Sequence, residues 1–135
     1  MKKFLLSVLV VVTLTACKKD KVEEPEEEHT ADLTSPVVTL NGPLENAIYF
    51  NTDTVIISGM VTDNELHSGA IEIKDDTTGQ VYFTASPYVH GFTSAAINYS
   101  YIVNVIKDSK VTLTVTYEDH EPNIGQKIVH MTFKP

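Results

Sequence analysis

Three histidines and several carboxylates between residues 63 and 121 have the chemistry of metal ligands. The candidate ligands are His67, His90, His120, Asp63, Asp119 and Glu121. Imidazole together with carboxylate suits Zn²⁺ or Cu²⁺, whereas carboxylates with carbonyl oxygens alone would suit Ca²⁺. No two of the histidines have the short spacing of a ligand pair on one element, so the fold would have to bring them together. The alternative is ordinary loop chemistry, because Asp, Glu and His also cap turns and stay solvated.

Aromatic side chains offer a second kind of site. Tyr82, Tyr88 and Phe92 would form a carbohydrate- or protein-binding patch if their rings are exposed. Packing in or beside the core is the alternative explanation. An enzyme would require a perturbed acid–base pair in a cleft, and the sequence carries no specific catalytic signature, so we expect none.

Composition excludes further classes of protein. Cys17 is the single cysteine, so the chain has no internal disulfide and no thiolate metal site. From residue 17 onward, 8 lysines and no arginine stand against 18 acidic residues, a formal charge of −10. Phosphate binding needs a basic face, and we therefore expect no nucleic-acid partner.

From Pro36 onward apolar residues recur with a period of two, which indicates half-buried β-strands. The clearest example is residues 111–117, where apolar side chains alternate with threonines. The predicted strands are 37–40, 55–61, 70–74, 80–85, 97–104, 111–117 and 127–133. Stretches rich in Asn, Asp, Gly and Pro separate them, as turn chemistry requires.

Seven short strands in about 100 residues predict an all-β fold, an Ig-like sandwich of two antiparallel sheets over residues 36–135. Alternation assigns the side chains that face inward. The predicted core is Val55, Ile57, Val61, Ile71, Ile73, Val81, Phe83, Ile97, Tyr99, Tyr101, Val103, Val111, Leu113, Val115, Tyr117, Val129, Met131 and Phe133.

Ig topology would position the candidate metal ligands. In that topology the loops 63–69, 86–96 and 118–125 meet at one end of the sandwich. The polar side chains collected there would be Asp63, Glu65, His67, His90, Glu118, Asp119, His120 and Glu121.

The N-terminal segment resembles a bacterial lipoprotein signal peptide. Lys2 and Lys3 precede an apolar run, and Leu14-Thr15-Ala16-Cys17 is similar to the lipobox that ends such peptides. The alternative, a membrane-spanning helix, needs ~20 apolar residues, and this run is shorter. The resemblance implies cleavage after residue 16, a diacylglycerol on the Cys17 thiol and a further acyl chain on its amine, which together give a firm anchor.

Residues 17–35 are expected to form a disordered acidic tether behind that anchor. They hold a cluster of lysines and then five glutamates around Pro25, with hardly an apolar side chain to bury. Such an acidic run is also similar to the surface-export signal of Bacteroidota lipoproteins, and a plain solvated spacer is the alternative. The expected location is the cell envelope, lipid-anchored at the outer membrane on its periplasmic or cell-surface face.

Two segments of the predicted sandwich resemble bacterial Ig-like domains. Residues 58–66 with 70–73 are similar to the passage from strand B to strand C, and residues 116–120 before Gly125 are similar to strand F and its closing loop. With no cysteine pair and no tryptophan, the chain resembles fibronectin-type and cadherin-like sandwiches more than antibody domains. The resemblance implies a non-catalytic binding module for an unknown protein or carbohydrate, and a metal-binding lipoprotein is the alternative.

Acylation of Cys17 is directly testable. Because lipid addition requires the thiol, Cys17→Ala is expected to abolish incorporation of labelled fatty acid in cells, whereas the unaltered chain is labelled. Label that persists in the Cys17→Ala protein would contradict the assignment.

Overall fold

Seven β-strands make up the regular structure of residues 32–135, the part of the chain that the computed structural model describes. They are β1 (Val37–Gly42), β2 (Ala47–Phe50), β3 (Thr54–Asp75), β4 (Val81–Ala85), β5 (Phe92–Ile102), β6 (Ser109–Asp119) and β7 (Ile124–Lys134). The predicted signal peptide, Cys17 and the tether as far as residue 31 lie outside the described residues. Within the described part, no helix is long and apolar enough to cross a membrane.

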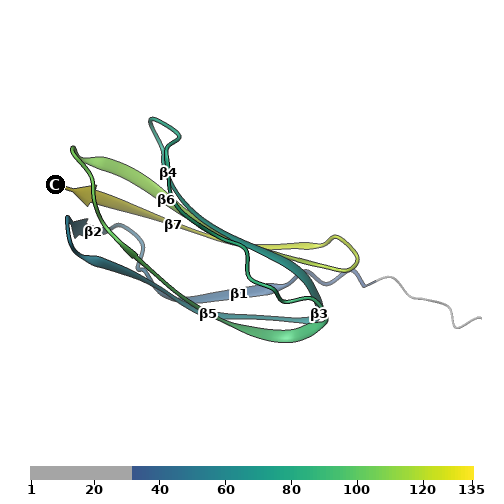
Figure 1. Ribbon diagram of the computed structural model, residues 1–135. Coiled ribbons are helices and arrows are strands. Elements are labelled where there is room, and N and C mark those ends of the chain that lie inside the picture. Colours follow the sequence, from purple (N-terminus) through teal and green to yellow (C-terminus); the bar gives the residue numbers. More distant parts are fainter. Residues whose placement is uncertain (1–31) are drawn as a thin grey trace, which may run out of the picture. The chain divides into compact units, whose positions relative to one another are not determined.

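Strand pairing sorts these elements into two layers that share β3 (Figure 1). The first half of β3 pairs with β1 on one edge and with β5 on the other. Its second half pairs with β4 and β6, and that sheet continues through β7 to β2. The pairing of β2 with β7 is parallel, and the other pairs in the described residues are antiparallel. The fold is therefore the predicted all-β Ig-like sandwich, with one parallel pair that alternation alone does not predict.

The largest difference from the predicted strands concerns β3, because residues 55–61 and 70–74 belong to one strand of 22 residues. The expected loop 63–69 continues the pairing through Leu66, which lies opposite Phe92 of β5 and Asp119 of β6. The register with β5 shifts between Thr62 and Leu66, and the register with β6 shifts between Leu66 and Ser68. Such irregularities bend a strand, and here they let it pass from one layer to the other.

One further strand and the lengths of two loops also differ from the sequence prediction. The four-residue strand β2 was not expected, because a short edge strand gives too little alternation to detect. The expected loop 86–96 ends early because β5 begins at Phe92, and the expected loop 118–125 shrinks because β6 runs to Asp119 and β7 begins at Ile124.

The core lies between the two layers and agrees closely with the predicted set. Phe83, Tyr99 and Tyr101 are half-buried against it, and the other predicted residues are buried apart from Val81. Val81 is 46% exposed, so its placement in the core was wrong. It begins the edge strand β4 opposite a register shift at Lys74, where the alternation is interrupted.

Leu66, Val89 and Val105 are also buried, although they lie outside the predicted strands. Leu66 and Val89 stand among residues without regular alternation, so a period of two does not single them out. Val105 continues the alternation of Tyr101 and Val103 and lies one residue beyond the predicted strand 97–104. Leu66 is fully buried because β3 continues through the expected loop.

Tyr117 is the largest fully buried side chain. Its hydroxyl has no hydrogen-bond partner among residues 32–135, and burial raises the pKa of Tyr117 to about 12. The ring packs against Gly69, where a Cβ would lie 2.6 Å from Cε1 of the tyrosine. Glycine at position 69 is therefore required by this ring.

Asp75 closes the turn between β3 and β4. Its Oδ1 accepts the N–H groups of Thr77 at 2.8 Å and Thr78 at 2.7 Å. Gly79, with a φ of 72°, donates its N–H to the Asp75 carbonyl at 2.9 Å. The hydrogen bond from Thr78, together with the one from Thr77, outweighs the opposing effect of burial and lowers the pKa of Asp75 to about 2.

The turn at Asp75 gives a pH-dependent contribution to stability. Because the folded pKa of about 2 lies below the ordinary 3.8, the charged carboxylate stabilises the fold fully above the ordinary value, and this stabilisation is lost as pH falls towards 2. Urea unfolding at several pH values should show that Asp75→Asn loses less free energy of unfolding across this window than the wild type. Asp108→Asn, at an exposed position, is the control, and identical pH slopes for wild type and Asp75→Asn would contradict the assignment.

Candidate metal centre

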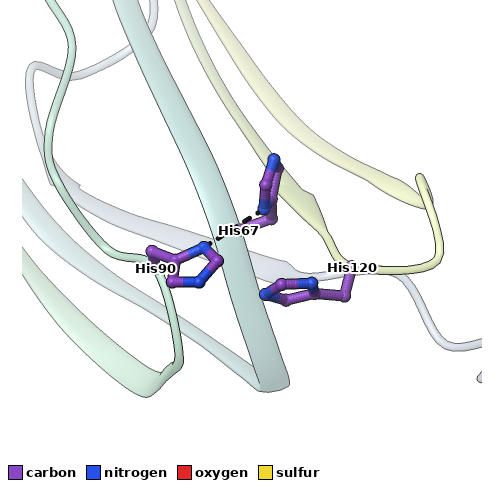
Figure 2. Close-up of side chains that lie close together, drawn as sticks. All are labelled: His67, His90 and His120. Carbon is purple, nitrogen blue, oxygen red and sulfur yellow. Dashed lines mark hydrogen bonds between the residues drawn. The ribbon is translucent and has the colours of Figure 1, made fainter.

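Three separate elements bring His67, His90 and His120 together at one end of the sandwich (Figure 2). His67 lies in β3 where that strand passes between the layers, and His90 lies in the connection from β4 to β5. His120 directly follows β6. The predicted convergence of the three histidines is what the described residues show.

The backbone around Leu66 explains why they converge. Leu66 pairs with Phe92 on one side and with Asp119 on the other, and its carbonyl accepts the N–H of Gly91 at 2.8 Å. Each histidine is a sequence neighbour of one of these aligned residues: His67 of Leu66, His90 of Gly91, and His120 of Asp119. Because neighbours on a strand point to opposite faces, burial of Leu66 turns His67 outward.

The ring nitrogens have spacings that a metal ion can bridge. One ligand atom from each ring lies within 4.8 Å of the others, and all three side chains are exposed. Ring centroids are 5.3 Å apart for His67 and His90, 4.8 Å for His67 and His120, and 4.7 Å for His90 and His120. A tetrahedral Zn²⁺ with bonds of about 2.0–2.1 Å holds its ligand atoms about 3.3–3.4 Å apart. The Nδ1 atoms of His67 and His90 are 3.3 Å apart, which is this spacing.

Glu65 is the carboxylate that contacts His120. Its Oε1 lies 3.6 Å from Nε2 of His120, and its side chain is 64% exposed. Sequence analysis places Glu65 at this end of the sandwich without assigning it as a ligand. Glu65 directly precedes the buried Leu66 and His67 directly follows it, so both face away from the core. This position next to Leu66 is the signal that could have identified Glu65.

Asp63 and Asp119, both predicted as ligands, are grouped with Asp32 rather than with the histidines. One carboxylate oxygen of each of the three lies within 4.8 Å of the others. Asp32 accepts a hydrogen bond from Asn64 Nδ2 at 2.8 Å. Sequence analysis missed Asp32 because it lies in the predicted tether, and nothing in the local sequence marks it.

The carboxylate of Asp119 is committed to its own loop. It is 3% exposed, and Oδ1 accepts the N–H groups of Glu121 and Asn123, each at 2.8 Å. Oδ2 accepts Nδ2 of Asn123 at 2.7 Å. Burial acts to raise the pKa of Asp119, but the hydrogen bonds from Asn123 and Glu121 outweigh it, and the pKa lies below its ordinary value. Glu121, the third predicted carboxylate, therefore contributes its amide to this loop.

Asp63 is partly committed in the same way. Its Oδ1 accepts the N–H of Glu65 at 3.0 Å. Its Oδ2 is buried and has no hydrogen-bond partner among residues 32–135. Only one of its two oxygens is thus satisfied within the described chain.

The aromatic candidates separate into two places. Tyr88 and Phe92 form an edge-to-face pair with centroids 6.4 Å apart, and they are 80% and 48% exposed. Tyr82 lies instead in an aromatic cluster, with its centroid 6.3 Å from Tyr101 and 5.8 Å from Phe133. Tyr82 therefore packs beside the core, and the exposed pair flanks His90 in the sequence.

Comparison with known proteins finds a structural similarity but no matching family. The chain matches no family model and no curated protein. Among solved structures it is similar to the fibronectin(III)-like modules of Clostridium thermocellum CbhA, with 12% sequence identity and a TM-score of 0.42. The similarity covers 76% of this chain and 47% of that chain, so this protein spans about half the length of its structural neighbour.

Proposed function

We propose that this chain is a lipid-anchored, non-catalytic binding module of the cell envelope whose ligand is a divalent transition-metal ion, Zn²⁺ or Cu²⁺. The observation that carries the proposal is the convergence of His67, His90 and His120, with ligand atoms within 4.8 Å of one another. Imidazole is a good ligand for both ions.

Several features favour a metal over ordinary loop chemistry. Three of the four histidines in the described residues, all except His130, gather at one point although they come from three different segments. Turn capping explains Asp75 and Asp119, whose oxygens accept backbone N–H groups. The histidine rings instead contact one another, and His120 also contacts Glu65. Their exposure leaves them accessible to an ion.

The anchor supports the same proposal. The lipobox at residues 14–17 would fix the chain to a membrane through lipid on Cys17. Outside the cytoplasm the single cysteine leaves histidine and carboxylate as the metal-binding side chains. An exposed histidine site on a tethered domain suits capture of ions from the surrounding solution.

Calorimetric titration of the purified lipoprotein in detergent tests this. Zn²⁺ or Cu²⁺ should bind at neutral pH, and affinity should fall in acid, because histidine ligands must be deprotonated to bind a metal. The His67→Ala/His120→Ala double variant should give no binding heat. Ion at about 100 times its dissociation constant should also stabilise the fold by about 2.7 kcal/mol and raise its melting temperature.

His130→Ala is the matched control. His130 lies outside the cluster and contacts Glu45 Oε1 through Nδ1 at 2.9 Å, so its removal should leave ion binding unchanged. Absence of heat with both ions at neutral pH, or equal heat from the double variant, would make the three histidines ordinary solvated side chains.

A second candidate is a contact surface for a protein or carbohydrate at Tyr88 and Phe92. The observation that favours it is their paired exposure beside His90, since exposed aromatic rings provide large contact areas for such ligands.

A screen against immobilised glycans and envelope proteins tests this second candidate. Ligands that bind the wild type should be lost with Tyr88→Ala, while Thr84→Ala on the exposed side of β4 should retain them. Equal binding by Tyr88→Ala and the wild type would exclude this surface.

A further inference from the structure

Resting on the metal site proposed above, we infer that Glu65 is the fourth ligand, so that the ion is held in a closed shell of three imidazoles and one carboxylate. This assignment replaces the carboxylates that the sequence suggested. The geometry and charge of these four side chains favour a divalent ion in a tetrahedral shell.

Around a bound ion the four proposed ligand atoms would form two opposite edges of a tetrahedron. His67 and His90 form one edge, with 3.3 Å between their Nδ1 atoms. His120 and Glu65 form the other, with 3.6 Å between Nε2 and Oε1. Around a tetrahedral Zn²⁺ with bonds of about 2.0–2.2 Å, nitrogen and oxygen ligands lie about 3.3–3.5 Å apart. Both pairs are close to the required length, whereas the carboxylate of Glu65 lies outside the group of ligand atoms that the three histidines form within 4.8 Å.

The backbone of β3 holds Glu65 in place for this role. Leu66 is fully buried, so Glu65 and His67 on either side of it both face away from the core. The backbone N–H of Glu65 donates to Asp63 Oδ1 at 3.0 Å, which fixes the main chain next to the ligand. The exposed side chain keeps the rotamer freedom needed to turn its carboxylate from His120 towards His67 and His90.

The competing carboxylates are less suitable. Asp119 is buried and both of its oxygens accept hydrogen bonds within its own loop. Asp63 is grouped with Asp32 and Asp119 and is bonded to the Glu65 amide. Recruiting Asp119 would break existing hydrogen bonds of the fold. The unsatisfied oxygen of Asp63 is buried, whereas the exposed carboxylate of Glu65 already contacts His120.

The ligand set has a chemical consequence. Four protein ligands close the shell, as in structural zinc sites, and leave no position for the reactive water of a catalytic one. The carboxylate cancels one positive charge of a divalent ion and suits harder ions than monovalent copper. Because Zn²⁺ accepts a tetrahedral shell and Cu²⁺ prefers a tetragonal one, the site should hold Zn²⁺ in preference to Cu²⁺ and should not activate water.

Co²⁺ serves as the probe, because its visible absorption is strong in tetrahedral sites and weak in octahedral ones. The lipoprotein in detergent should give the intense tetrahedral bands with Co²⁺, and Zn²⁺ should displace them. Glu65→Gln should weaken these bands and lower Zn²⁺ affinity at least about tenfold. Glu121→Gln, an exposed carboxylate at the same end, is the matched control and should behave as the wild type.

The outcomes separate the two levels of the proposal. If the wild type binds neither Co²⁺ nor Zn²⁺, the metal site itself fails. If the wild type binds both ions but Glu65→Gln keeps the same affinity and spectrum, Glu65 is not a ligand although the histidine site stands. A loss produced by Glu121→Gln instead would also overturn the assignment. The melting temperatures of the metal-free variants control for unfolding. Because Glu65 and Glu121 are both exposed, each substitution should change the melting temperature only slightly.

Discussion

The structure depends on how β3 crosses between the two layers, and Leu66 fixes that crossing. This side chain is fully buried and its backbone pairs with both β5 and β6. Burying a leucine contributes about 1.5–3 kcal/mol, so the chain gains free energy by inserting this residue between the sheets. The exposed positions of Glu65 and His67 are consequences of that insertion, and the core and the candidate site are thus set by the same side chain.

The fold was predictable where alternation is regular. Residues 111–117 alternate through most of β6 and correctly predicted its buried face. Alternation gave no warning that residues 55–61 and 70–74 are one strand, because a bulge carries no fixed sequence pattern and the intervening residues are mostly polar. The parallel strand β2 is too short to give a period, and the irregular register opposite Lys74 left Val81 exposed.

The sequence predicted which segments meet at the site but not which carboxylate lies beside the histidines. Ig topology brings the segments of His67, His90 and His120 to one end, and this follows from strand order alone. Which carboxylate accompanies them depends on hydrogen bonds that sequence does not encode simply. The carboxylate of Asp119 accepts hydrogen bonds from the amides of its own loop. The irregular register of β3 before Leu66 places Glu65 where its carboxylate contacts His120.

The three histidines come from segments that whole strands separate along the chain. An ion bound by all of them would act as a cross-link, joining β3 to two loops in a protein whose one cysteine precludes an internal disulfide. Tying distant residues together reduces the conformational freedom of the unfolded chain, and the effect grows slowly with the length of the closed loop. Unlike a disulfide, this cross-link would need no oxidant. It would form when metal is available and would be lost when metal is removed or the solution is acidified. The local stability of this end of the domain would therefore depend on the metal concentration around it.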